Sequence, residues 1–92
     1  MSMEKLAECR RQIDQVDRQI LGLLNERTAI VHEIGRIKQT LALPIYEPKR
    51  EEQVFENITS ANRGPLTADA LKRIFERIID EMRTIQRNNA AS

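Results

Sequence analysis

The sequence predicts an all-α fold of three helices, of which the first is very long. Three observations lead to this prediction. Residues 4–41 contain no proline, and apolar residues recur through them at steps of three and four, the spacing of an amphipathic helix. Two proline-marked connections, around Pro44 and Pro65, interrupt the rest of the chain. A shorter amphipathic segment follows each connection, so every predicted element is a helix.

The apolar stripe of the first helix also predicts a partner. It consists of Leu6, Ile13, Val16, Ile20, Leu23, Leu24, Ile30, Val31, Ile34, Ile37 and Leu41. A helix over residues 4–41 would be roughly 55 Å long, whereas a compact domain of this size is only about 30 Å across. The chain alone would leave part of the stripe uncovered. A second copy is the simplest cover, so we expect an intertwined helical homodimer.

The two later helices have recognisable ends. Pro48 is expected to be the first residue of the second helix, because its fixed φ suits that position. The breakers at 62–65, Asn-Arg-Gly-Pro, should end it, and Thr67 should cap the third helix. The inner face of the second helix would be Val54, Phe55 and Ile58. The inner face of the third would be Leu71, Ile74, Phe75, Ile78, Ile79, Met82 and Ile85.

Composition excludes several classes of protein. The 92 residues include 15 basic and 14 acidic side chains, for a net charge of +1, and the basic residues form no dense run. With only three aromatic residues, neither an electrostatic nor a stacking surface for nucleic acid is expected. Cys9 is the single cysteine, which excludes an internal disulfide, and without a Cys/His cluster we expect no metal.

The length and the terminal segments predict one domain. Residues 1–92 suffice for one small core, and the polar tail at 88–92 is expected to fray. The N-terminal segment lacks the apolar core of a signal peptide, and no run approaches membrane-spanning length. We therefore expect a cytoplasmic protein without a membrane partner.

Polar residues interrupt the apolar faces. Arg27 and Lys38 stand where the stripe calls for apolar residues, and their separation of about three turns makes them point the same way. Buried cations are costly without partners, so the pair asks for an anion. The whole inward-facing polar set is Arg10, Arg27, Lys38, Glu51 and Gln86, with Arg50 at its edge. Three cations, a carboxylate and an amide suit a small dianion that carries a hydroxyl group and a further oxygen.

Taken singly, these residues have plainer explanations. Arg27 can pair with Glu26 or Glu33, and Glu51 in a first turn can simply favour the helix dipole. Distance restricts the set further. Arg10 and Arg27 are roughly 25 Å apart along one helix, so they cannot grip one small molecule from the same chain. If Arg10 joins the site, it must come from the partner chain.

The combined pattern strongly resembles the all-helical chorismate mutases. The matching residues are Arg10-x-x-Ile13-x-x-x-Asp17, Leu23-Leu24-x-Glu26-Arg27, Glu33-Ile34-Gly35-x-x-Lys38, Pro44, Tyr46-Glu47-Pro48-x-Arg50-Glu51 and Ile78-Ile79-x-x-x-x-x-x-Gln86. Each fragment alone is a weak signal, but together they cover about residues 5–87 with specific spacing.

The resemblance implies the conversion of chorismate to prephenate in phenylalanine and tyrosine biosynthesis, an intramolecular Claisen rearrangement that uses no cofactor. It implies homodimers whose long helices pair and whose sites use both chains. Arg27 and the partner's Arg10 should hold the two carboxylates of the substrate. Lys38 should touch a carboxylate and the ether oxygen, and Gln86 should reach the ether oxygen from the other side.

The resemblance also assigns the remaining substrate-binding positions. Glu51 should bind the ring hydroxyl, helped by the backbone near Glu47, with Arg50 close by. Two of these positions depart from the common pattern. Glu47 stands where an aspartate is frequent, and Met82 stands where many relatives carry a small hydroxyl residue.

Three alternatives stay open at this point. An isochorismate-pyruvate lyase shares the fold and a similar cationic pocket, but its pattern lacks the glutamate matched by Glu51. Relatives also act as regulatory modules of the first shikimate-pathway enzyme, so that synthase is a conceivable partner. A plain structural coiled coil would need no ligand at all. In that case Arg27→Leu and Lys38→Leu would stabilise the dimer without loss of activity.

Overall fold

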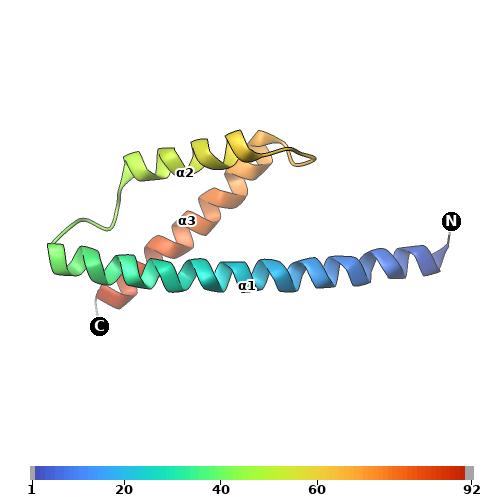
Figure 1. Cartoon of the computed structure of the whole chain (residues 1–92), viewed down its shortest axis with the longest axis horizontal. Coiled ribbons are helices and arrows are strands. Elements are labelled where there is room, and N and C mark those ends of the chain that lie inside the picture. The colour runs from blue at the N-terminus through green and yellow to red at the C-terminus, as the bar shows by residue number, and fades with distance from the viewer. Residues whose placement is uncertain (1, 91–92) are drawn as a thin grey trace. The chain divides into compact units, whose positions relative to one another are not determined.

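The computed structural model describes residues 2–90 and contains three helices (Figure 1). They are α1 (Met3–Leu41), α2 (Pro48–Ala61) and α3 (Ala68–Ala90). Every regular element in the described part of the chain is a helix, which confirms the predicted all-α class. The expected frayed tail at 88–92 lies partly outside the described residues, and α3 continues through Ala90. No helix within residues 2–90 combines the length and the apolar character that crossing a membrane needs.

The chain divides into two units, Met1–Ile30 and Val31–Ser92, which are considered separately here as the first and the second unit. The first unit is a stretch of α1. Most apolar side chains of the predicted stripe are exposed in it, namely Leu6, Ile13, Val16, Ile20, Leu23 and Ile30. The helix therefore carries an apolar face that its own chain leaves in solvent.

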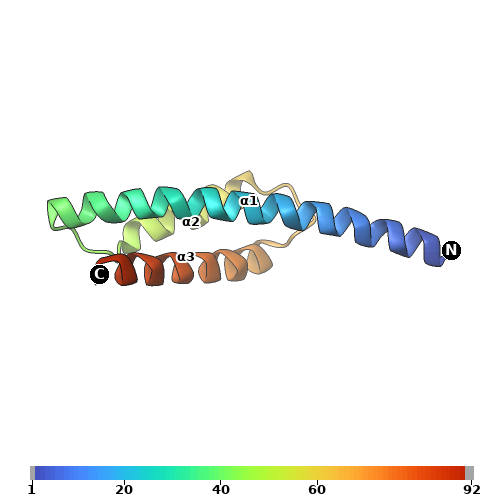
Figure 2. The same ribbon diagram turned by 90° about the horizontal axis from the view of Figure 1, so that it is seen from below.

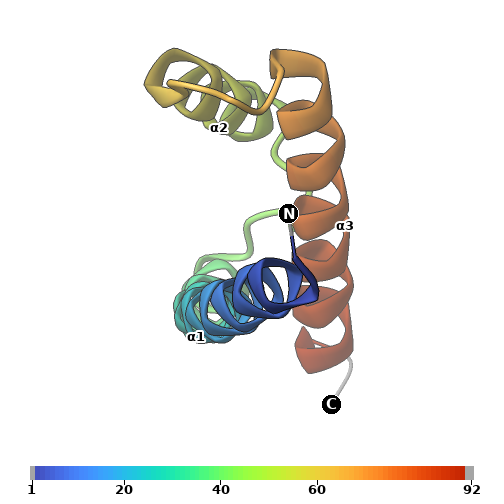
Figure 3. The same cartoon turned by 90° about the vertical axis from the view of Figure 1, so that its right-hand side faces the viewer.

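The second unit contains the end of α1 together with α2 and α3. α2 packs against α3. The C-terminal half of α3 passes the last turns of α1, drawn in green in Figures 2 and 3. Gly35 marks this approach, because a Cβ atom built on it would lie 3.7 Å from Cγ of Gln86. The buried side chains of the unit are Val31, Lys38, Ile79 and Met82. A lysine thus belongs to a small, otherwise apolar core.

The end of α1 shows how the chain turns. Ala42 adopts a left-handed conformation with a φ of 56°, and the amide of Leu43 donates to the carbonyl of Lys38 at 2.8 Å. This is the Schellman arrangement, which normally places glycine at the left-handed position. Pro44 follows directly, so the helix ends where the sequence predicted.

The starts of α2 and α3 also agree with prediction. Pro48 is the first residue of α2. The hydroxyl of Thr67 accepts a hydrogen bond from the amide of Ala70 at 3.1 Å, which is the predicted N-cap. Some predicted apolar positions are exposed in this chain, namely Ile74 of the expected inner face of α3 and Ile34, Ile37 and Leu41 of the α1 stripe. Ile74 has a local reason. It lies at the edge of the apolar arc centred on Ile79 and Met82, where periodicity discriminates least.

Candidate functional site

Among the charged residues predicted to belong to the site, Lys38 is the most deeply buried, with 7% of its surface exposed. Its Nζ atom lies 2.7 Å from Oε1 of Glu47 and donates to the carbonyl of Ile45 at 2.8 Å. Both partners belong to the connection between α1 and α2. The Schellman turn folds this connection back over the end of α1, which brings Glu47 to a lysine nine residues earlier in the chain.

Gln86, on α3, also approaches the end of α1. Its side chain packs over Gly35, one turn before Lys38 on α1. Its Oε1 atom is buried and has no hydrogen-bond partner. An unmatched buried acceptor costs about 1–3 kcal/mol, so Oε1 can accept a hydrogen bond that the described residues do not supply, whereas any hydrogen bond that Gln86 donates must come from Nε2. The end of α1 therefore carries a buried cation at Lys38, and one turn earlier, at Gly35, it is covered by the Gln86 side chain of α3.

Glu51 lies on α2, and its carboxylate faces α3. Arg83 donates from Nη2 to Oε1 of Glu51 at 3.2 Å, and its Nε lies 3.1 Å from Oε2. The Nε contact is short enough for an ion pair but is not aligned as a hydrogen bond. The guanidinium also reaches Asp80 at 3.1 Å and lies 5.2 Å from the centre of the Tyr46 ring. Glu51 is thus held by a residue that the sequence reasoning did not include.

A signal for Arg83 is present in the sequence. It lies four residues after Ile79 and three before Gln86, both of which were placed on the inner side of α3. The same rule of misplaced polar residues that selected Lys38 would have selected Arg83. Arg83 was not selected, because the adjacent Met82 already accounted for the apolar face at this turn of α3.

The remaining predicted residues are more dispersed. Met82 is buried in the core of the second unit. Arg50 is exposed on α2 and donates to Gln53 at 3.4 Å on its own helix. In the first unit, Arg10 is exposed and Arg27 is partly buried. The second unit therefore joins Lys38 to Glu47, packs Gln86 over Gly35 and pairs Glu51 with Arg83, while Arg50 contacts Gln53 on its own helix.

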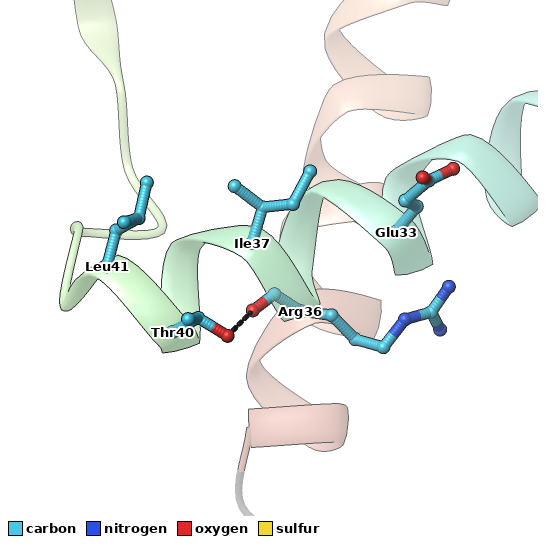
Figure 4. A pocket seen from close by; sticks show the side chains of 5 residues that line it. All are labelled: Glu33, Arg36, Ile37, Thr40 and Leu41. Carbon is cyan, nitrogen blue, oxygen red and sulfur yellow. Dashed lines mark hydrogen bonds between the residues drawn. The ribbon is translucent and has the colours of Figure 1, made fainter.

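A separate shallow hollow lies along the last turns of α1 (Figure 4). It is lined by Glu33, Arg36, Ile37, Thr40 and Leu41. The hydroxyl of Thr40 is already committed to the carbonyl of Arg36 at 3.0 Å. The hollow includes none of the predicted site residues and is formed by one helix, so it offers no enclosed binding site.

The described side chains show no metal centre. Within residues 2–90, no three of the histidine, cysteine, aspartate and glutamate side chains are grouped so that they could hold a metal ion. The site instead offers a lysine, an amide and a carboxylate. Such groups can bind an anion and donate to an oxygen atom, and the arrangement suits binding and electrostatic stabilisation of a reacting molecule.

Comparison with known families gives a match over most of the chain. Residues 9–87 match the family described as chorismate mutase type II. A bifunctional chorismate mutase/prephenate dehydratase of Aquifex aeolicus is 39% identical over 89 residues, which cover 92% of this chain and 25% of that protein. The chain spans about a quarter of the length of such bifunctional relatives.

Two further proteins match along most of their own length. A chorismate mutase of Methanocaldococcus jannaschii is 31% identical over 86 residues, which cover 92% of this chain and 87% of that protein. The crystal structure of a chorismate mutase from Helicobacter pylori in complex with prephenate superposes with a TM-score of 0.86 at 30% identity. That superposition covers 96% of this chain and 94% of the other.

Proposed function

The chain belongs to the chorismate mutase type II family, and from that premise we propose that it converts chorismate to prephenate. The reaction is an intramolecular Claisen rearrangement that serves phenylalanine and tyrosine biosynthesis. The observation that carries this proposal is the buried ammonium of Lys38, together with the Gln86 side chain of α3, which packs over Gly35, one helical turn before Lys38 on α1. The proposed compartment is the cytoplasm.

Lys38 has capacity left for a substrate. An ammonium group has three N–H donors, and the contacts of Lys38 in the described chain engage two of them, with Ile45 and Glu47. A third donor is available to a substrate carboxylate or to the ether oxygen. Because the ammonium is buried, its attraction for an anion is stronger than it would be in water.

The rearrangement needs no nucleophile and no general base. It needs a flexible dianion held in a compact reactive shape, and donors aimed at the ether oxygen, on which charge develops as the C–O bond breaks. In this proposal Lys38 and Gln86 are those donors. Arg27 would bind one carboxylate through its planar fork of donors. No step requires a cofactor.

The second carboxylate would be held across a dimer interface. Arg10 is exposed on α1, and if it contributes to a site, its distance from Arg27 along the helix means that the site belongs to the partner chain. The exposed apolar face of α1 supports a homodimer, because isolated soluble chains rarely leave so long an apolar face in solvent. Each site would then combine Lys38 and Gln86 of one chain with Arg10 of the other.

The ring hydroxyl would bind near the start of α2. Glu51 is the proposed acceptor, assisted by the backbone at Glu47, with Arg50 near the entrance. Met82 would contribute apolar contact only, because its thioether cannot replace the hydrogen bond of a hydroxyl residue.

A direct assay tests the proposal. The purified chain is incubated with chorismate, and prephenate is measured by chromatography against the uncatalysed reaction; a parallel incubation with isochorismate is examined for salicylate. We expect prephenate to form and salicylate to be absent. Failure to accelerate prephenate formation would refute the proposed activity. A rate that rises sharply when the first shikimate-pathway synthase is added would identify that enzyme as a regulatory partner.

A further inference from the structure

Arg83 joins three segments of the second unit around Glu51. Its guanidinium contacts the carboxylate of Glu51 on α2, the carboxylate of Asp80 on α3, and the face of Tyr46 in the connection after α1. The Glu51 contact bridges 32 positions of sequence and links α2 to α3. Arg83 thus lies where the connection and both shorter helices meet.

The contact with Glu51 is better shielded than a surface ion pair. The side chains of Arg83 and Glu51 are 26% and 22% exposed, whereas the Arg77–Glu81 pair on the same helix is 77% and 53% exposed. Ion pairs on an open surface contribute little, because water and salt screen them. Shielding, the hydrogen bond from Nη2 to Oε1 and the approach of Nε to Oε2 give the Arg83 pair a defined orientation.

Tyr46 and Asp80 restrict the guanidinium itself. A cation 5.2 Å from the centre of an aromatic ring is within the range of cation–π attraction, and the ring limits the rotation of the planar group. Asp80 accepts from the same Nη2 atom that donates to Glu51. A long side chain with three fixed partners is a rigid support rather than a mobile surface charge.

We propose that Arg83 is a positioning residue, which orients the Glu51 carboxylate so that it can accept the hydrogen bond of the substrate's ring hydroxyl. Arg83 would not touch the substrate and would act only through Glu51. This inference rests on the proposed function, since it concerns the substrate hydroxyl. It predicts that the kinetic effect of removing Arg83 depends on the presence of Glu51.

A double-mutant cycle with chorismate as substrate tests this dependence. Arg83→Met removes the guanidinium and keeps the chain length, Glu51→Gln removes the carboxylate, and the third variant combines both. Loss of an oriented, charge-assisted hydrogen bond should lower kcat/KM by roughly tenfold to a hundredfold in either single variant. The double variant should be no worse than Glu51→Gln alone, because Arg83 then has nothing to orient.

Two further variants separate positioning from general stability. Arg77→Met removes an exposed guanidinium on the same helix and should leave kcat/KM within about twofold of the unaltered chain. Arg83→Lys keeps the charge but not the planar guanidinium, so its kcat/KM should lie between those of Arg83→Met and the unaltered chain. Circular dichroism and a melting curve are recorded for each. If Arg83→Met does not fold, the cycle is run with Arg83→Lys.

Some results would overturn the role of Arg83 alone, and another would overturn the proposed function. Losses that multiply in the double variant, or an Arg83→Met variant as active as Arg77→Met, would overturn the inference while leaving the proposed function in place. An increase in activity would also overturn it, because it would mean that Arg83 obstructs Glu51. If the unaltered chain itself does not convert chorismate, the proposed function fails and the inference falls with it.

Discussion

At the scale of single residues, Lys38 combines burial with charge. A buried ammonium is costly unless it is paired, and here Glu47 and the carbonyl of Ile45 offset that cost. An apolar side chain of the same length would fill this position without any desolvation penalty. Stability alone therefore does not call for a lysine at this position.

Replacing Lys38 separates these two requirements. Lys38→Met should lower kcat for chorismate by roughly a hundredfold to a thousandfold, because a donor to the developing charge is lost. The melting temperature should stay the same or rise, since a buried ion pair is often no more stabilising than apolar packing. Steady-state kinetics and thermal unfolding measure both effects. A variant with near-normal kcat would remove Lys38 from the catalytic role.

Gln86 allows a test by pH. A carboxylate cannot donate a hydrogen bond, whereas a carboxylic acid can, so Gln86→Glu should be active only where the new side chain is protonated. Its activity should rise as pH falls toward the ordinary glutamate pKa of about 4.3. Rates measured from pH 4 to 8, about the practical range, should show this rise in the variant only.

The exposed Gln39 provides the matched control for that experiment. Gln39→Glu makes the same chemical change one residue after Lys38 and should leave the pH profile of the unaltered chain in place. If Gln86→Glu has that same unaltered profile, Gln86 does not donate to the reacting oxygen.

At the scale of the helices, the end of α1 determines which residues contact Lys38. The turn at Ala42 and Leu43 reverses the chain and lets the connection reach Lys38. Ala42 has a positive φ of 56°, a conformation that costs a residue with a Cβ atom about 1–2 kcal/mol. The backbone at Ala42, four residues after Lys38, is therefore strained, and a glycine at this position would relieve the strain.

Substitution of Ala42 tests this description. Ala42→Gly should increase the free energy of unfolding by roughly 0.5–1 kcal/mol, the relief of strain minus the greater entropy of glycine in the unfolded chain. Ala29→Gly, in the interior of α1, should instead lower it by about 1 kcal/mol. Urea denaturation at one protein concentration compares the two. Equal destabilisation by both would mean that Ala42 is not left-handed in solution.

At the scale of the whole molecule, the proposed homodimer would share each site between two chains, and the exposed apolar face of α1 supports a dimer. Arg10 lies in the first unit and Lys38 in the second. In such a dimer, each site would combine Lys38 of one chain with Arg10 of the other. If one chain lacks Lys38 and its partner lacks Arg10, both defects fall in the same site. The second site of that dimer would be intact.

Mixing two inactive variants tests this arrangement. Arg10→Ala and Lys38→Ala should each be nearly inactive, and unfolding and refolding them together should restore about a quarter of the sites. The control mixes Lys38→Ala with Gln86→Ala, which damage the same chain's share of the site and should restore nothing. Native mass spectrometry verifies that mixed dimers form. Mixed dimers without recovered activity would exclude the contribution of Arg10 across chains.

The ends of the helices could be predicted from the sequence, but the surroundings of some side chains could not. Helix bounds at Leu41, Pro48 and Ala68 follow from local chemistry, because caps and prolines act within a few residues of each end. The exposure of Ile74 and the pairing of Arg83 do not. They depend on the rotation of α3 about its axis, and side chains at the edge of an apolar arc change surroundings with a small rotation.

The three helices, their connections, the apolar stripe of α1 and the family resemblance can all be read from the amino-acid order. The partners of the polar residues became known from the fold: Glu47 for Lys38, Arg83 for Glu51, and an unmatched oxygen for Gln86. Helix formation depends on neighbours three or four positions away, which the sequence displays directly. Polar pairing depends on which side chains meet when helices pack and turns close, and that geometry is set by the fold.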